Sequence, residues 1–139
     1  MVSTQRVLFI CSHNSARSQM AEGYLNARYG DRYSAFSAGT ASSAVHPMAI
    51  EVMREIGIDI IGQRSKTLGE FFGQSFDIVV TVCDRAQGIC PFFPGAGRTI
   101  HHSVPDPSRY DGSREDMRKA FRDVRDEIIR WIDREFGPE

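Results

Sequence analysis

The sequence lacks the features that mark secreted, membrane-spanning or nucleic-acid-binding proteins. It has only three cysteines in 139 residues, an odd and small number that excludes a scaffold held together by disulfides. Its longest apolar runs, Val7–Cys11 and Ile78–Cys83, are far shorter than the roughly 18 residues that a membrane helix needs. Residues 1–6 lead straight into the first of these runs, without the pattern of a cleaved signal peptide. These absences predict a cytoplasmic protein whose cysteines serve reactivity or packing.

Neither sign of charge is in excess. Seventeen basic and eighteen acidic residues give a formal net charge of −1, whereas a general nucleic-acid-binding protein carries a basic excess. We therefore expect no nucleic-acid or membrane partner, and we expect a monomer. The length fits one domain over residues 1–139, and no internal repeat or Gly/Ser-rich linker divides it.

Short apolar runs alternate with helical patterns along the chain. Strands are predicted at residues 5–10, 33–37, 76–83 and 99–102. Helices are predicted at residues 15–29, 47–56, 67–72 and from Ser113 onward. Glycines and prolines indicate loops at residues 84–97 and 103–111. Because alternating strands and helices form βαβ units, we predict an α/β fold with a four-stranded parallel sheet, in the order 2-1-3-4, and with helices on both faces.

The most informative segment is C-S-H-N-S-A-R-S, residues 11–18, here called the oxyanion loop. It follows the first predicted strand and opens the first predicted helix. In such a loop, successive backbone N–H groups and the helix N-terminus surround a tetrahedral anion. Arg17 adds a planar fork that can hold two oxyanion oxygens. Asn14 suits a left-handed backbone turn.

Cys11 is the predicted nucleophile of this loop. The positive surroundings favour its thiolate, and Ser18 is placed to donate a hydrogen bond to the sulfur. The alternative is a cysteine buried at a strand end with a surface arginine nearby. The residues predicted to bind the oxyanion are Ser12, His13, Asn14, Ser15, Ala16, Arg17 and Ser18.

Asp106 is the candidate acid. It lies in V-P-D-P, residues 104–107, where the prolines can hold a carboxyl group over the mouth of the oxyanion loop. A carboxylic acid so placed can protonate a departing oxygen. The alternative is a solvated aspartate in an ordinary turn. His101 and His102 are weaker candidates, because alternate residues of a strand face opposite sides and at most one of them can face the site.

The spacing C-x5-R-S after the first strand resembles the active-site loop of the low-molecular-weight protein tyrosine phosphatase family. The continuation N-S-A-R-S-Q-M-A-E-G at residues 14–23, the S-A-G of residues 37–39 and the pair of Cys83 and Cys90 resemble the arsenate reductase branch of that family. The resemblance covers essentially the whole chain in order. One departure is His13, which stands where many loops of the family have glycine and adds a side chain at the rim.

The resemblance implies reduction of arsenate to arsenite through a thiol relay, without a cofactor. Cys11 attacks arsenic while Asp106 protonates the departing oxygen; Cys83 then attacks Cys11 and releases arsenite. Cys90 next attacks Cys83, which leaves a Cys83–Cys90 disulfide for thioredoxin to reduce. Phosphate or sulfate should compete with arsenate for the loop.

Other interpretations of these residues stay open. Cys83 and Cys90 could be inert packing thiols, or could form a metal site with His101 or His102, although their spacing matches neither a C-x-x-C redox motif nor a zinc ribbon. A phosphotyrosine phosphatase would use Cys11, Arg17 and Asp106. It would leave Cys83 and Cys90 without a role. A non-catalytic anion sensor is a third class.

Lys66 departs from a further feature that the resemblance implies. Some arsenate reductases of this family hold a potassium ion beside the active-site loop, and its ligands would fall on Asn14, Glu22, Ser37 and a carboxylate at position 66. This chain has Lys66 there. A lysine ammonium is a compact cation that can take the place of the metal; the alternative is a lysine that points to solvent.

Overall fold

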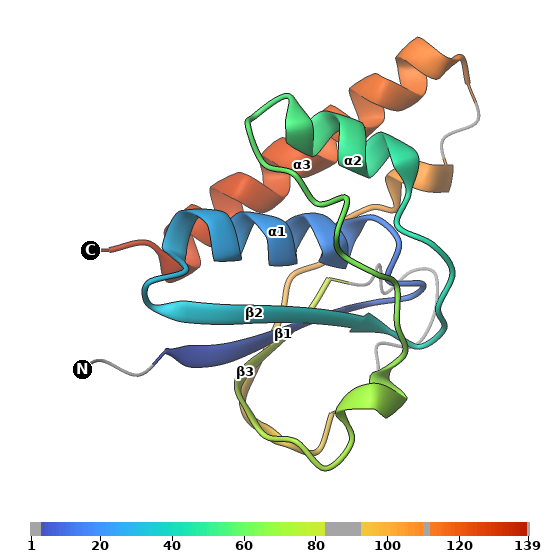
Figure 1. Cartoon of the computed structure of the whole chain (residues 1–139). Coiled ribbons are helices and arrows are strands. Elements are labelled where there is room, and N and C mark those ends of the chain that lie inside the picture. The colour runs from blue at the N-terminus through green and yellow to red at the C-terminus, as the bar shows by residue number, and fades with distance from the viewer. Residues whose placement is uncertain (1–3, 83–92, 110–111, 139) are drawn as a thin grey trace.

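The computed structural model describes residues 4–82, 93–109 and 112–138. Four parallel strands form one sheet in the order β2-β1-β3-β4, which confirms the predicted order. The strands are β1 (Gln5–Cys11), β2 (Tyr33–Gly39), β3 (Phe76–Thr81) and β4 (Ala96–His101). The carboxyl ends of these strands share one edge of the sheet, and this edge carries the oxyanion loop (Figure 1).

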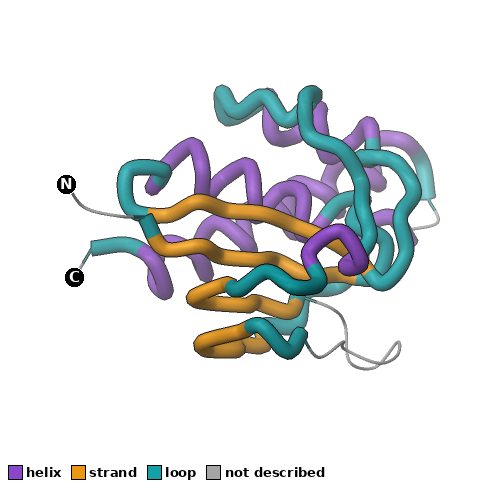
Figure 2. Tube along the Cα trace, turned by 60° about the horizontal axis from the view of Figure 1, so that its bottom comes forward, coloured by secondary structure: helices purple, strands orange, loops and turns teal. Residues whose placement is uncertain are grey.

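The two faces of the sheet are covered differently. The three α-helices, α1 (Arg17–Tyr29), α2 (Pro47–Arg54) and α3 (Arg114–Phe136), pack on one face. The 3₁₀ helix η1 (Leu68–Phe71) packs on the other (Figure 2). The prediction of helices on both faces is confirmed, but in the described part of the chain the second face has only this short 3₁₀ helix. No helix in that part is long and apolar enough to cross a membrane.

The continuous apolar run of β1 is explained by burial on both sides. Val7 and Phe9 belong to the cluster under the α-helices, whereas Leu8 and Ile10 belong to the cluster under η1. All four are fully buried, and burying each such side chain stabilises the fold by about 1.5–3 kcal/mol. One side of α3 also faces the core; its buried residues are Phe121, Val124, Ile128, Trp131, Ile132 and Phe136.

Two helix starts follow the rules of capping. The Ser113 side chain accepts a hydrogen bond from the Asp116 backbone N–H at the start of α3. At the start of α2, the Nδ1 atom of His46 accepts from the Met48 backbone N–H, and Pro47 takes the first helical position.

Several predicted boundaries were wrong. Helix α1 begins at Arg17 rather than at residue 15, because the residues before it form the oxyanion loop. Strand β4 begins at Ala96 rather than at residue 99, because Ala96 pairs with Phe76 of β3. The predicted helix at 67–72 is the 3₁₀ helix η1, and the predicted loop at 103–111 contains a second one, η3 (Pro107–Arg109).

Candidate active site

A small pocket at the carboxyl end of β1 collects most of the predicted site residues. Its lining consists of Cys11, His13, Ser15, Ala16, Arg17, Asp106 and Ser108. The pocket lies where the chain leaves β1 for α1, beside the neighbouring end of β3, which is the usual position of ligand sites in parallel sheets. Its volume of about 20 Å³ suits a small inorganic anion better than a large organic group.

Cys11 ends β1 and is 2% exposed. Its Sγ atom lies 2.8 Å from the Oγ atom of Ser18, in the first turn of α1. This contact confirms the predicted proximity of the hydroxyl to the sulfur. Asn14 has φ of 51°, in the left-handed region, as predicted, and its side chain is fully buried.

The backbone of the oxyanion loop is held from outside through its carbonyl groups. The Ser12 carbonyl accepts hydrogen bonds from the Ala41 N–H and the Thr40 hydroxyl, and the Ser15 carbonyl accepts from the His46 N–H. These bonds hold the loop backbone in the curved shape in which its N–H groups can surround an anion. Ala16, the N-cap residue of α1, has no side-chain oxygen to occupy the first-turn N–H groups.

The close approach of the oxyanion loop explains why residue 39, at the end of the S-A-G motif, is a glycine. A Cβ atom at this position would lie 2.7 Å from the Asn14 backbone nitrogen and 2.9 Å from the Ser12 carbonyl oxygen. Any side chain would therefore push the oxyanion loop away from the end of β2.

Arg17 is buried and links three parts of the site. Its Nη1 atom donates to the carbonyl oxygens of Val104 at 3.1 Å and Val82 at 3.4 Å. Its Nη2 atom lies 3.7 Å from the Oδ2 atom of Asp106. The guanidinium is thus fixed beside the pocket by backbone groups, and it brings the predicted acid to the predicted anion site.

Asp106 is held as a carboxylate. Its Oδ1 atom accepts from the backbone N–H and the hydroxyl of Ser108 at 3.0 and 2.6 Å, and Arg109 lies 3.9 Å from Oδ2. Burial alone would raise the pKa of Asp106, but the Ser108 hydrogen bonds and the charges of Arg17 and Arg109 together lower it below the ordinary value. An anion bound next to this carboxylate would raise its pKa again.

The sequence interpretation missed Ser108, which lines the pocket and holds Asp106. A local signal for this contact existed, because an aspartate side chain in a turn commonly accepts from the backbone N–H two residues on. It also left out Gln19, which is fully buried. The Nε2 atom of Gln19 lies 2.8 Å from the Asn14 Oδ1 atom and 3.0 Å from the Asn14 carbonyl oxygen.

His101, which ends β4, and His102, which follows it, lie outside the pocket lining. His101 contacts the Thr81 hydroxyl at 2.6 Å, whereas His102 stacks on Trp131 with ring centroids 4.8 Å apart and lies 3.7 Å from Glu127. His13 is exposed at the rim of the pocket, as predicted.

The predictions for Cys83 and Cys90 lie outside the described residues. Within the described ranges, no group of three or more His, Cys, Asp and Glu side chains could hold a metal ion. The interpretation of these two cysteines as metal ligands is therefore not tested.

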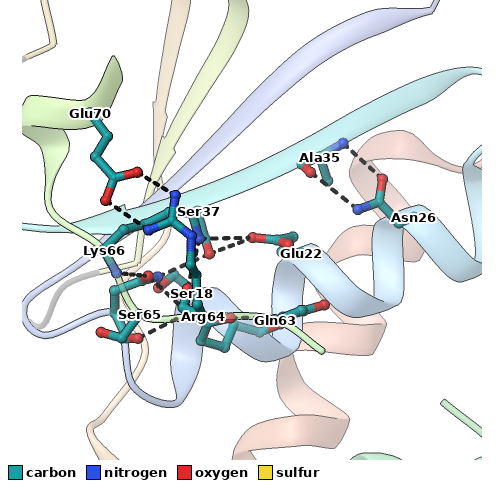
Figure 3. Close-up of polar contacts among 12 residues, drawn as sticks. Ser18, Glu22, Asn26, Ala35, Ser37, Gln63, Arg64, Ser65, Lys66 and Glu70 are labelled. Atoms are coloured by element: carbon teal, nitrogen blue, oxygen red, sulfur yellow. Dashed lines mark hydrogen bonds and ion pairs between the residues drawn. The ribbon is translucent and has the colours of Figure 1, made fainter. Parts of the chain in front are cut away.

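The residues at the implied potassium position do not fit that ion. The Asn14 Oδ1 atom already accepts from the Lys66 backbone N–H and from Gln19. The Glu22 Oε1 atom accepts from the Ser37 hydroxyl and lies 3.8 Å from the Lys66 ammonium (Figure 3). A positive group of the protein therefore lies beside Glu22, one of the implied oxygen ligands.

The chain is similar over most of its length to known proteins of one family. A sequence profile described as low molecular weight phosphotyrosine protein phosphatase matches residues 6–135. The arsenate reductase of Halalkalibacterium halodurans is 42% identical over 126 residues, 91% of each chain. A solved structure of an arsenate reductase in the phosphate binding state has a TM-score of 0.73 at 32% identity, over 94% of this chain and 98% of its own.

A second structural relative is named for its dependence on thioredoxin. It is the thioredoxin-dependent arsenate reductase of Corynebacterium glutamicum, with a TM-score of 0.66 and 26% identity, and the match covers 92% of this chain and 60% of that one. The chain belongs to the low molecular weight phosphotyrosine protein phosphatase family. Within it, the chain is similar in sequence to members that are named arsenate reductase.

Proposed function

We propose that this protein reduces arsenate to arsenite. The observation that carries the proposal is the convergence of Cys11, Ser18, Arg17 and Asp106 around the N-terminus of α1. These groups supply a nucleophile, a donor to its sulfur, a cation for an oxyanion and a carboxyl group for the departing oxygen. The arsenate reductases among its relatives support arsenate as the substrate.

In the first step, the Cys11 thiolate attacks arsenic and one As–O bond breaks. The departing oxygen leaves as water with a proton from Asp106, which takes up that proton from solvent when the dianion binds beside it. The buried guanidinium of Arg17, with the loop N–H groups, stabilises the negative charge on the remaining oxygens. Arsenic stays at oxidation state five in the resulting Cys11–arsenic adduct.

In the second step, the electrons come from thiols. A Cys83 thiolate attacks the Cys11 sulfur, an S–S bond forms, and the S–As bond breaks with its electron pair on arsenic. Arsenic is reduced to oxidation state three and leaves as arsenite. Cys90 then attacks Cys83, so that Cys11 departs as a thiolate and a Cys83–Cys90 disulfide remains. A dithiol protein of the thioredoxin type is the proposed reductant, as in the Corynebacterium relative.

A phosphotyrosine phosphatase is the second candidate, because the matching family profile carries that description. It would use the same pocket, with Cys11, Arg17 and Asp106. It would leave Cys83 and Cys90 without a chemical role.

The test is the pairing of cysteines after one arsenate turnover without reductant, determined by mass spectrometry. Trypsin places the three cysteines on separate peptides, residues 7–17, 67–85 and 86–98. A disulfide between the last two peptides, with one arsenite released per protein, is the expected result. Three free thiols after incubation with arsenate, together with rapid hydrolysis of an aryl phosphate, would favour the phosphatase instead.

A further inference from the structure

Lys66 is an unusual lysine in this chain. The sequence has two lysines and fifteen arginines, and Lys119, the other lysine, is exposed. The Lys66 side chain is only 10% exposed. Its Nζ atom donates to the Arg64 carbonyl oxygen at 2.9 Å and lies 3.8 Å from Glu22, which is itself 14% exposed. A lysine this buried is rare unless it is paired.

The two buried charges depend on each other. Burial raises the pKa of Glu22, and its contacts with Ser37 and Lys66 oppose that effect. Burial lowers the pKa of Lys66, and the charge of Glu22 opposes that effect. Removal of either partner would therefore favour the neutral form of the other.

A chain of hydrogen bonds runs from this pair to the nucleophile. The Ser37 hydroxyl donates to Glu22 at 2.6 Å. The side-chain amide of Asn14 donates to the hydroxyl oxygens of Ser37 at 2.9 Å and Ser18 at 2.8 Å. Since the amide occupies one lone pair of Ser18, the O–H of Ser18 is left for the Cys11 sulfur, 2.8 Å away.

The backbone of Lys66 fixes the same amide from its other side. The Lys66 N–H donates to the Asn14 Oδ1 atom at 2.9 Å, and the Lys66 carbonyl accepts from the Gly39 N–H at 3.0 Å. With its oxygen held there, the Asn14 amide can turn only its nitrogen toward the two serines. The network therefore fixes Asn14, which has the left-handed backbone and lies at the centre of the oxyanion loop.

We propose that the Lys66 ammonium is a positioning group for the oxyanion loop: paired with Glu22, it is a built-in cation that holds Asn14 and Ser18 in the arrangement that binds an anion and activates Cys11. The proposal rests on the proposed function only in taking residues 11–18 as the anion site. This cation belongs to the chain itself, at the position where the family resemblance implies a carboxylate ligand of potassium.

The test compares Lys66→Met with Lys119→Met. Two properties that need no arsenate reduction are measured: phosphate affinity by calorimetry, and the rate of Cys11 alkylation by iodoacetamide. The alkylated cysteine is identified on the tryptic peptide of residues 7–17. Loss of the charged group should lower both quantities by about tenfold, the effect of a hydrogen bond to a charged group. Lys119→Met should match the wild type.

A rescue experiment separates a positioning role from a merely structural one. Lys66→Ala leaves room for a small amine, so n-propylammonium should restore phosphate affinity and alkylation, whereas tetramethylammonium at equal ionic strength should not. If Lys66→Met does not fold, Lys66→Gln keeps a donor for the Arg64 carbonyl without the charge and takes its place.

The outcomes distinguish this inference from the proposed function. Wild-type affinity and alkylation in a folded Lys66→Met or Lys66→Gln protein would overturn the inference alone. Equal rescue by both ammonium ions would overturn it as well, because it would indicate a general salt effect. A wild-type protein that binds no phosphate would instead remove the anion site on which the proposed function depends.

Discussion

The Nη2 atom of Arg17 lies 3.7 Å from the Oδ2 atom of Asp106, beside the pocket that contains Cys11. As long as the two side chains pair, Arg17 helps to keep the pKa of Asp106 below its ordinary value. A tetrahedral dianion that binds Arg17 weakens this pair and adds negative charge next to the carboxylate. Anion binding thereby favours protonation of the group that must act as an acid.

Cys11→Ser should abolish arsenate reduction, with a loss on the order of 10⁶-fold, because the chemistry has no other route without its nucleophile. The protein should stay folded, since serine is smaller than cysteine and can still bond to Ser18. Arsenite formation and circular dichroism are the two measurements. Substantial remaining reduction in a folded Cys11→Ser protein would contradict the assignment.

Cys90→Ala should stall after one turnover, with Cys11 bonded to Cys83, because no third thiol can attack that disulfide. Cys83→Ala should block before this disulfide forms. Peptide mapping of both variants after arsenate treatment distinguishes the two states. Sustained thioredoxin-dependent turnover by Cys90→Ala would mean that the relay stops at Cys83.

Phosphate and sulfate should compete with arsenate, because backbone N–H groups and Arg17 recognise tetrahedral shape and charge rather than the central atom. Slow hydrolysis of an aryl phosphate through Cys11 is expected for the same reason. Steady-state inhibition measures the competition, with chloride at equal ionic strength as the control. The absence of any competition would remove the case for the oxyanion loop.

Acidification should destabilise the fold through His46. Burial lowers the pKa of His46, and the nearby charge of Asp106 only partly opposes this effect. A depressed pKa favours the neutral form in the folded state, so its contribution to stability is present above pH 6.5 and is lost as pH falls through the folded pKa. His102 acts in the same direction, since burial also lowers its pKa.

The matched variant for this prediction is His46→Asn, because asparagine also caps helices well but does not titrate. Urea unfolding at pH 8 and pH 5 gives the free energy of unfolding at each pH. The wild type should lose more of it on acidification than His46→Asn. An equal loss in the two proteins would place the pH dependence elsewhere.

Potassium should not raise the stability or turnover of the wild type relative to sodium, because the Lys66 ammonium lies 3.8 Å from Glu22. Lys66→Asp should acquire such a dependence, since it replaces the ammonium with a carboxylate beside the oxygens of Glu22 and Ser37. Melting temperature in potassium, sodium and tetramethylammonium chloride at equal ionic strength measures both effects. A potassium-specific gain in the wild type would show that a metal site survives beside Lys66.

The sequence determined the features that local rules encode. The continuous apolar runs of β1 and β3 required burial on both faces, and the alternation of strands with helices gave the order of the sheet. The left-handed Asn14 and the proximity of Cys11 and Ser18 also followed from short-range patterns. Both depend on residues within the eight positions of the oxyanion loop.

Only the tertiary structure decided the contacts between distant segments. Strand β4 starts at Ala96 because it pairs there with β3. The sequence around Gly95 and Gly97 has no pattern that predicts a strand. Lys66 is buried against Glu22, and Arg17 donates to two carbonyl oxygens. Both arrangements depend on how the ends of several strands meet at one edge of the sheet. Such contacts arise from register and packing across the whole sheet, and the free energy of burying a charge is set by neighbours that the local sequence does not specify.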